Sequence, residues 1–501
     1  MITAITVLLA LGFLGWGFYR ARPFGRLGLL AWAQSVVLMA PWILAFSLTA
    51  VGIYLNLVAV LFMFVLSTGL YIYLGKRLRT LSQDAALSRR VSEVPSTQQS
   101  GSSESLPQGA SAENQSENLT PDLKTLSGEE IVPIPADDLR IIQGIFGIDT
   151  FFVTETIPYQ EGAVFRGNLR GEPEAVYSKL SASLQERLED RYRLFLVEDQ
   201  SNKPVVIVLP SSRDPKPMTV FQKVIAGVLL LVTFAASLES AGLMRNFDFF
   251  STPNRFVEAF PLSLGILSVL AVHEIGHWVL AKRYNVRLSL PFFIPTWQIG
   301  SFGALTRFES LLPNRTVLFD VAFAGPAAGG LLSLGMLLTG LVLSHQGSVF
   351  QLPTEFFKGS ILVGTLARLV LRESLQQPLV DVHPLVILGW LGLVITALNL
   401  MPAGQLDGGR IVQAIYGRKV AGRTTIGTII VLGLFAIFNP LALYWAIVVL
   451  FLQRELERPT LNDLTEPDDT RAGLALLALF LTIATLLPIT PGLAGRLGIG
   501  T

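Results

Sequence analysis

The stretch AVHEIGHWVLAKR, residues 271–283, places two histidines and a glutamate in an apolar run. From Pro261 to Ala281 the only ionisable side chains are His273, Glu274 and His277. An ionisable group inside a bilayer is expensive, so each one needs a partner or a chemical task. The run is also long enough to cross a membrane. The stretch therefore predicts a membrane helix that carries a functional site.

The composition indicates a polytopic α-helical membrane protein rather than a soluble enzyme. Of the 501 residues, 51% are hydrophobic and 15% are charged. The formal net charge of +1 gives no electrostatic argument for a nucleic-acid partner. The sequence contains no cysteine, which excludes disulfides and thiolate metal sites. Any metal must therefore be held by His, Asp, Glu or Asn.

The N-terminal part, residues 1–75, is expected to cross the membrane three times. The expected helices cover residues 2–19, 27–49 and 52–74. The first run could instead be a signal peptide, but it lacks a positively charged n-region, and its arginines follow it. We therefore expect a retained helix. Basic residues in the loops 20–26 and 76–90 place both loops on the cytoplasmic side.

A polar segment and a small soluble α/β domain are expected after the third helix. Residues 76–130 are rich in Ser, Gln, Gly and Glu and contain no aromatic residue, which predicts a disordered linker. Residues 131–217 alternate between helical and strand patterns. Helices are expected at 137–146 and 173–189, and strands at 151–157, 163–170, 193–198 and 204–210.

Apolar runs resume in residues 218–455, which form the expected transmembrane core. Its expected spans are 219–243, 260–283, 317–344, 384–401, 424–438 and 440–453. Residues 456–501 are expected to hold a linker and a last helix at 471–489, for a total of about ten membrane helices. The segment 358–380 contains Arg368 and Arg372 and is better explained as interfacial. Basic clusters at 282–287, 307–315, 418–423 and 454–458 put these loops on the cytoplasmic side, with the soluble domain.

The His-Glu-x-x-His spacing is typical of a zinc site that hydrolyses peptide bonds. On a helix, residues i and i+4 share one face, about 6 Å apart along the axis, so both imidazoles can reach one metal. Zinc lowers the pKa of a water towards about 7, and Glu274 can take its proton and deliver it to the leaving amine. A lone buried histidine is more often structural. Two histidines and a glutamate at membrane depth would cost much free energy if their role were only structural.

A third zinc ligand is expected from the stretch ALNLMPAGQLDGGR, residues 397–410. Asp407 follows a helix break at Pro402 and Gly404, and irregular backbone at membrane depth is tolerated where it lines a cavity. The alternative role for Asp407 is a helix N-cap. Asp407 lies three residues before Arg410, and His277 five residues before Lys282, so both are expected at similar depth. The remaining histidines, His345 and His383, fall at helix ends expected on the opposite side and are not favoured as ligands.

Three motifs together resemble the site-2 proteases, a family of membrane-embedded zinc metalloproteases. They are HEIGH (273–277), FAGPAAGG (323–330) and NLMPAGQLDGG (399–409), and the resemblance covers roughly residues 219–455. It implies that His273, His277 and Asp407 hold one Zn²⁺ and that Glu274 is the general base. It also implies that Asn399 positions the substrate or the oxyanion.

Two further motifs resemble the chloroplast and cyanobacterial branch of this family. They are GNLR (167–170) and HPLVILGW (383–390). Many bacterial members carry a PDZ domain within the core, and we recognise no sequence for one here. The 131–217 domain and the N-terminal helices stand in its place, so substrate rules of PDZ-bearing members are not carried over.

The stretch PFFIPTWQIGSFGALTRF, residues 291–308, has prolines, glycines and aromatics in place of a helical repeat. We interpret it as a re-entrant hairpin whose strand edge could hold an unwound substrate through main-chain bonds. A plain connecting loop is the alternative. The small residues of GPAAGGLLSLG, 325–335, indicate close helix packing.

The function that follows is an intramembrane zinc endopeptidase acting near the cytoplasmic side in regulated intramembrane proteolysis. Its expected partners are transmembrane protein substrates and membrane lipid, with no nucleic acid. The protein is expected to be a multi-pass integral protein of a plasma or thylakoid-type membrane. A non-proteolytic assembly factor of the same fold is one alternative, disfavoured because Glu274 and the expected ligands are present. A transporter is another, but we find one broken helix and no internal repeat.

Overall fold

The structure is a computed structural model that describes residue 15, residues 17–50 and scattered positions between 63 and 78. It further describes residues 134–159, 161–199, 201–296, 299–436, 440–450 and 455–499. The expected spans 2–19 and 52–74 lie largely outside the described residues, and the expected linker 76–130 does so except at two positions. The chain divides into two compact units, Met1–Gly128 with Gly433–Tyr444, and Glu129–Leu432 with Trp445–Thr501.

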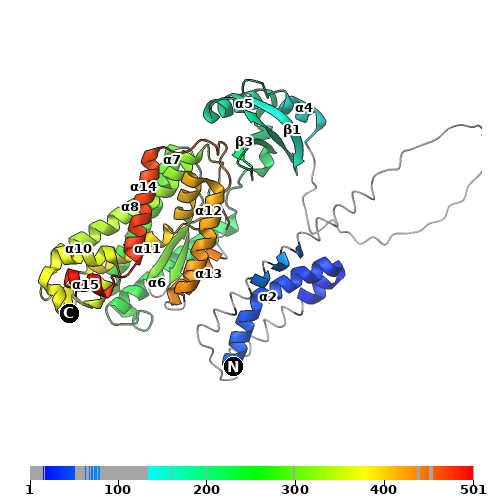
Figure 1. Ribbon diagram of the computed structural model, residues 1–501. Helices are drawn as coiled ribbons and strands as arrows, with labels where there is room; N and C mark the ends of the chain where they lie inside the picture. Colours follow the sequence, from blue (N-terminus) through cyan, green and yellow to red (C-terminus); the bar gives the residue numbers. More distant parts are fainter. Residues whose placement is uncertain are drawn as a thin grey trace, which may run out of the picture. The chain divides into compact units, whose positions relative to one another are not determined.

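The first unit contains a long apolar helix where one was expected. After the short η1 (Arg22–Phe24), helix α2 runs over Gly25–Ala50 and includes Pro41. It covers the expected span 27–49 and is drawn in blue in Figure 1.

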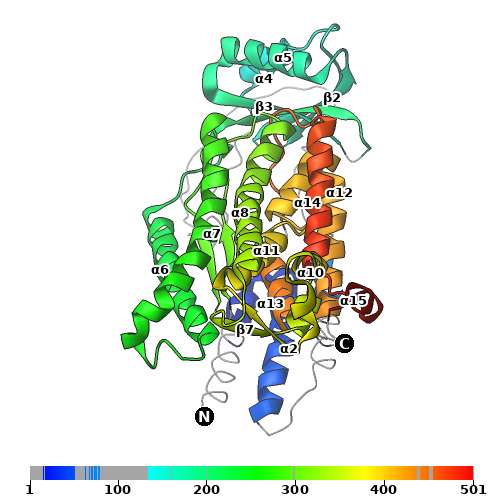
Figure 2. The same ribbon diagram turned by 90° about the vertical axis from the view of Figure 1, so that its left-hand side faces the viewer.

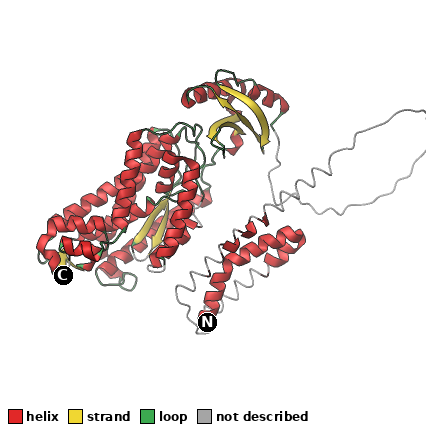
Figure 3. Ribbon diagram, in the orientation of Figure 1, coloured by secondary structure: helices red, strands yellow, loops and turns green. Residues whose placement is uncertain are grey.

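The second unit begins with the α/β domain of residues 131–217, and all of its expected helices and strands are present. They are α4 (Ala136–Gln143), β1 (Phe151–Tyr159), β2 (Gly162–Leu169), α5 (Pro173–Leu188), β3 (Tyr192–Glu198) and β4 (Pro204–Pro210), with short turns η3 (Glu189–Arg191) and η4 (Ser211–Arg213). The strands form one antiparallel sheet in the order β1-β2-β4-β3. Figure 3 shows this sheet in yellow beside its helices.

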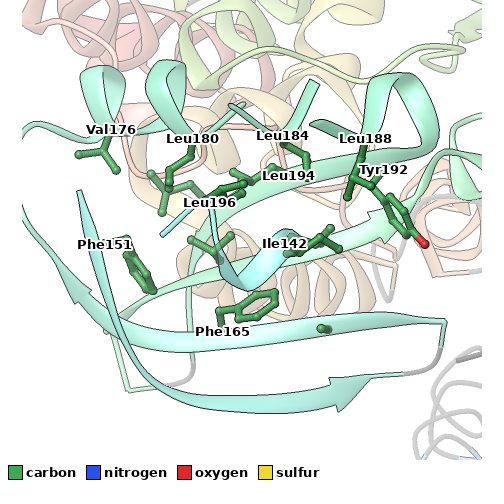
Figure 4. Packing of buried hydrophobic residues seen from close by; sticks show 14 residues of the cluster. Ile142, Phe151, Phe165, Val176, Leu180, Leu184, Leu188, Tyr192, Leu194 and Leu196 are labelled. Atoms are coloured by element: carbon green, nitrogen blue, oxygen red, sulfur yellow. The ribbon is translucent and has the colours of Figure 1, made fainter. Parts of the chain in front are cut away.

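The core of this domain follows from the helical spacing of α5. Val176, Leu180, Leu184 and Leu188 recur every fourth residue and are all buried. Figure 4 shows them facing side chains of the sheet, including Leu196.

Gly167 of the GNLR motif lies within β2, where a side chain would have no room. A Cβ at this position would overlap the carbonyl oxygen of Phe152. The pairing of β1 with β2 shifts register between Val153 and Glu155, and this bulge brings the strands together irregularly. The glycine is therefore explained by a close approach of two strands inside the sheet.

The described part of the chain after η4 is mostly helical. Its helices are α6 (Val220–Met244), α7 (Phe256–Arg283) preceded by η5 (Pro253–Arg255), α8 (Arg315–Leu343), α9 (Glu355–Lys358), α10 (Ile361–Leu371) followed by η6 (Arg372–Gln376), α11 (Pro384–Asn399), α12 (Asp407–Phe435), α13 (Pro440–Val448), α14 (Asp469–Leu486) and α15 (Pro491–Leu497). Two short hairpins are formed by β5 (Phe292–Thr296) with β6 (Gly300–Leu305), and by β7 (Phe350–Pro353) with β8 (Leu379–Val382).

Among the described residues, 4 helical segments are long and apolar enough to cross a membrane. They are Val220–Met244, Pro253–Arg283, Arg315–Leu343 and Asp469–Leu486. Helix α11 is apolar but has 16 residues. Helix α10 has 11 residues, about 16 Å at 1.5 Å per residue, which is too short to cross a bilayer.

Small residues allow the core helices to pack closely, as the stretch 325–335 predicts. Helix α8 packs against both α7 and α11, and Figure 2 shows the three helices side by side. A Cβ at Gly276 of α7 would lie 2.5 Å from the carbonyl oxygen of Ala324. Such contacts bring helix backbones together in a membrane.

The expected boundaries around residue 420 are wrong. We expected a basic loop at 418–423 and a span at 424–438, but α12 runs from Asp407 to Phe435 with one non-helical residue, Gly417. Gly417 has φ 80°, which interrupts the helix for a single residue before it resumes. The basic residues after it therefore lie on a helix, for which Arg and Lys have good propensity.

The stretch 291–308 forms a hairpin, as predicted. Strands β5 and β6 pair in antiparallel fashion and pack against α6, and β6 also packs against α11. The hairpin thus follows the HEIGH helix and lies within the helical core.

A segment after α13, residues 455–466, joins the α/β domain to the helical core. The N–H of Leu196 on β3 donates to the carbonyl of Leu461, and the N–H of Asp463 donates back to Leu196, at 2.8 and 2.9 Å. The N–H of Asn462 donates to the carbonyl of Pro313 at 2.9 Å. We call residues 455–466 the connector.

Candidate metal centre

Two helix faces bring His273, His277 and Asp407 together. The histidines lie four residues apart on one face of α7, and Asp407 is the first residue of α12. Their exposed fractions are 6, 5 and 8%. The carboxylate therefore meets the imidazoles inside the protein, where a charged group needs a partner.

The three side chains form a triangle that fits one zinc ion. His273 Nε2 lies 3.1 Å from both His277 Nε2 and Asp407 Oδ2, and His277 Nε2 lies 3.4 Å from the same oxygen. A tetrahedral Zn²⁺ with ligands at about 2.0–2.2 Å keeps its donor atoms about 3.3 Å apart. Two imidazole nitrogens and one carboxylate oxygen are also the donor types that zinc binds without cysteine.

A hydrogen bond from the second ring nitrogen of His277 fixes the orientation of its imidazole ring. Its Nδ1–H donates to the carbonyl of Val321 on α8, at 2.7 Å. This bond leaves the lone pair of Nε2 directed at Asp407 and His273. Such a bond from the second ring nitrogen is typical of histidines that ligate metals.

The DGG sequence, residues 407–409, explains why Asp407 lies beside the two histidines. Helix α11 ends at Asn399, and the chain reverses before α12 begins at Asp407. A Cβ at Gly408 would overlap the carbonyl of Leu400, so the reversal depends on a glycine here. The predicted helix break at Pro402 and Gly404 is confirmed, since both residues lie between α11 and α12.

Arg315 stabilises the short helical segment that begins with Asp407. Its guanidinium donates to the carbonyls of Ala414 and Ile415 at 2.7 and 2.6 Å. These carbonyls precede the interruption at Gly417 and would otherwise lack helical partners.

Glu274 lies beside the histidines without joining the triangle. Its carboxylate is within 4.8 Å of ligand atoms of His273 and His277. The hydroxyl of Thr306, just after β6, donates to Glu274 Oε2 at 2.7 Å. The carboxylate is half-buried and is held in one position by this bond.

A small cavity adjoins the triangle of side chains. His277, Thr306, Asn399 and Asp407 are among the residues that line it, and its volume is about 20 Å³. This volume suffices for one water molecule.

Asn399 faces this cavity and ties the hairpin to α11. Its side-chain amide donates to the carbonyl of Phe302 on β6 at 3.2 Å and to that of Ile395 at 2.9 Å. Both amide hydrogens are thereby used within the protein.

The other two histidines have different surroundings. His383 caps α11, because its side chain accepts the N–H of Leu385. His345 is exposed, and its Nδ1 contacts the carbonyl of Gln346. Among the described residues, the group of side chains close enough to hold a metal consists of His273, Glu274 and His277, and neither His345 nor His383 belongs to it.

Comparison with known proteins identifies the family. Residues 261–439 match peptidase family M50, and residues 140–217 match the EGY3 middle domain. The chain is 39% identical over 416 residues to the probable zinc metalloprotease EGY1, chloroplastic, of Arabidopsis thaliana, covering 75% of this chain and 76% of that protein. The chain belongs to peptidase family M50, the site-2 proteases. The predicted resemblance is thereby confirmed.

Other relatives of this site-2 protease carry similar names. It is 38% identical to the probable zinc metalloprotease EGY2, chloroplastic, of Arabidopsis thaliana over 368 residues, 72% of this chain and 66% of that protein. It is 31% identical to the probable zinc metallopeptidase EGY3, chloroplastic, of the same plant over 382 residues, 71% of this chain and 66% of that protein. No solved structure matches the chain. The chain is thus a membrane zinc metalloprotease of the chloroplast-type branch, which confirms the predicted enzyme class and cofactor.

We expect Gly325→Ala to lower the zinc content of the protein strongly. A Cβ at Gly325 of α8 would overlap the imidazole ring of His277, so the ring must leave its place. Gly335→Ala is the matched control, because Gly335 lies on the same helix and has no atom within 4 Å of the added carbon. Zinc per purified chain, measured by atomic absorption, should fall in the first variant and stay unchanged in the second. Equal zinc in both would show that His277 tolerates displacement.

Proposed function

We propose that this site-2 protease is an intramembrane endopeptidase that cuts peptide bonds within or near a transmembrane segment of its substrates. The observation that carries the proposal is the position of the triangle. His273 and His277 lie in α7, one of the segments long and apolar enough to cross a membrane. His277 is five residues, about 7 Å, from Lys282 at the basic end of that helix, which supports cleavage near the cytoplasmic side.

We assign His273, His277 and Asp407 as the zinc ligands. Zinc supplies a Lewis acid that polarises the scissile carbonyl and promotes ionisation of the attacking water. With three protein ligands, one position is left open for chemistry.

Glu274 is assigned as the general base. Its Oε1 can accept the proton of the attacking water while Oε2 accepts the hydroxyl of Thr306. The protonated carboxyl can then deliver the proton to the leaving amine.

Asn399 and the hairpin are assigned to substrate positioning. A helical substrate must unwind before hydrolysis, because its backbone groups are paired internally. An edge of the β5–β6 hairpin can hold the unwound segment by main-chain bonds. Asn399 keeps β6 next to the cavity through its bond to Phe302, and this supports a role in placing the substrate.

The topology we propose has about ten membrane helices, with the 131–217 domain inserted after the third and lying on the cytoplasmic side. The connector supports this sidedness, since it bonds the soluble domain to Leu312 and Pro313 in the loop after the hairpin. The chloroplastic names of the relatives support a thylakoid-type membrane. The substrates are transmembrane proteins, cut in regulated intramembrane proteolysis.

Removal of zinc is expected to abolish cleavage reversibly. Purified protein in liposomes with a single-span substrate should lose activity in 1,10-phenanthroline and recover it when zinc is restored. The isomer 1,7-phenanthroline, which does not chelate, is the control for inhibition by the aromatic compound itself. Cleavage that persists in protein without measurable zinc would contradict the proposed chemistry.

A further inference from the structure

Thr306 is the residue that holds the carboxylate of Glu274. It follows β6 directly, and its hydroxyl donates to Glu274 Oε2 at 2.7 Å. A glutamate side chain has several rotamers, and fixing one costs free energy that a specific bond must supply. A threonine is stiff at χ1, so its hydroxyl direction depends on where its backbone is held.

The backbone of Thr306 is held in turn by a buried arginine. The Nη2 of Arg410, on the first turn of α12, donates to the carbonyl of Thr306 at 2.7 Å. The guanidinium also bonds the Oε2 of Glu457 in the connector, at 3.1 Å from Nε and 3.0 Å from Nη2. Its Nη1 lies 3.9 Å from Asp407 Oδ1. Arg410 and Glu457 are 5 and 7% exposed, so this is a buried ion pair.

The guanidinium of Arg410 therefore contacts both the group of proposed metal ligands and the residue that holds Glu274. Through Asp407 it faces the metal ligands, and through Thr306 it reaches the group that orients Glu274. The planar guanidinium of arginine has several N–H donors with fixed directions and can make these contacts simultaneously. The single ammonium group of lysine cannot reproduce this geometry.

We propose that Thr306 is a positioning residue for Glu274, and that the Arg410–Glu457 pair fixes Thr306 for this task. The inference rests on the proposed function, in which Glu274 is the base. With Oε2 engaged by the hydroxyl, Oε1 is the oxygen left to accept the proton of water. Threonine at 306 thus acts on turnover and not on zinc binding.

The first test compares Thr306→Val with Thr306→Ser in the full-length protein. Valine keeps the shape and removes the donor, whereas serine keeps the donor. We expect Thr306→Val to lower kcat by about 10- to 100-fold, as is typical for partners of reacting groups, and Thr306→Ser to stay near wild type. KM, zinc per chain and the melting temperature should not change in either variant. An experimental structure of Thr306→Val should show the Glu274 carboxylate displaced.

Three results would overturn the inference. Unchanged kcat in Thr306→Val would show that the bond has no role. A raised KM with unchanged kcat would make Thr306 a substrate contact. Equal losses in the valine and serine variants would indicate packing alone.

The second test asks whether Arg410 acts through Thr306. Removing one partner of a buried pair is strongly destabilising, so Arg410→Lys is used because it keeps the charge. If both residues act through Glu274, the loss of kcat in Arg410→Lys with Thr306→Val should be close to that of the worse single variant. Independent losses that multiply, with zinc per chain and the melting temperature of Arg410→Lys both near wild type, would overturn the link.

Glu274→Gln, measured in parallel, separates this inference from the proposed function. If wild type cleaves, Glu274→Gln does not, and Thr306→Val equals wild type, only the positioning role fails. If Glu274→Gln cleaves as well as wild type, both fail together.

Discussion

Glu274→Gln should retain zinc and lose peptide hydrolysis. Glutamine has the size of glutamate but cannot take a proton from water, so the general-base contribution of about 10²- to 10⁴-fold is lost. The proposed ligands His273 and His277 should keep their positions, because their contacts to Asp407 and Val321 do not involve Glu274. The measurement is the initial rate on a single-span substrate, with zinc per chain determined on the same preparation.

Glu258→Gln is the matched control. It is the same substitution on the same helix, in the first turn and on the surface. Its ion pair with Arg255 is exposed and is worth little. Both zinc and activity should remain at wild-type levels in this control. Full activity of Glu274→Gln would rule out the assigned mechanism.

Asp407→Ala and Asp407→Asn should both lose zinc and, with it, activity. Each substitution leaves only the two imidazoles as ligands, whereas a catalytic zinc site uses three protein ligands. The asparagine variant separates the two roles considered for Asp407, since asparagine is as good as aspartate at starting a helix but is a neutral, poor ligand. Zinc retained in Asp407→Asn would mean that Asp407 caps the N-terminus of α12 and does not bind the metal.

Asp469→Ala is the control for this pair. Asp469 is the first residue of α14, as Asp407 is of α12, but it is exposed. The control should keep its zinc. Zinc loss there would point to general damage rather than to a missing ligand.

The grouping of the three proposed ligands was predictable because its signals are local in the sequence. The four-residue spacing of His273 and His277 places them on one helix face wherever the helix lies. Asp407 was predicted from the helix break at Pro402 and Gly404, and from a distance to Arg410 similar to that between His277 and Lys282. The structure brings these three residues together. Two local sequence patterns were therefore enough to predict a contact between residues that are far apart in the chain.

The groups that orient the ligands were not predictable in this way. Thr306 lies in a stretch where nothing distinguishes its hydroxyl from that of an ordinary loop residue. The carbonyl of Val321 carries no sequence signal, because every residue has one. The smallness of Gly325 was visible and was correctly read as close packing, but the sequence does not show that the neighbour is His277.

In the α/β domain, too, the local elements were predictable and the long-range contacts were not. Its helices and strands were predicted in order, because strand and helix periodicities are properties of short windows. The pairing of β2 with β4 and the bonds of the connector to Leu196 join distant residues. The residues of the connector have no strand pattern of their own, so the sequence predicted only a linker there.

The most direct test of the central claim is to locate the scissile bond. Wild-type protein and Glu274→Gln, each with measured zinc, are incubated in liposomes with a single-span protein, and the product ends are determined by mass spectrometry. We predict new ends inside the apolar segment, towards its cytoplasmic end, with wild type only. Cleavage confined to the substrate's extramembrane regions, or the same products with Glu274→Gln, would contradict the account.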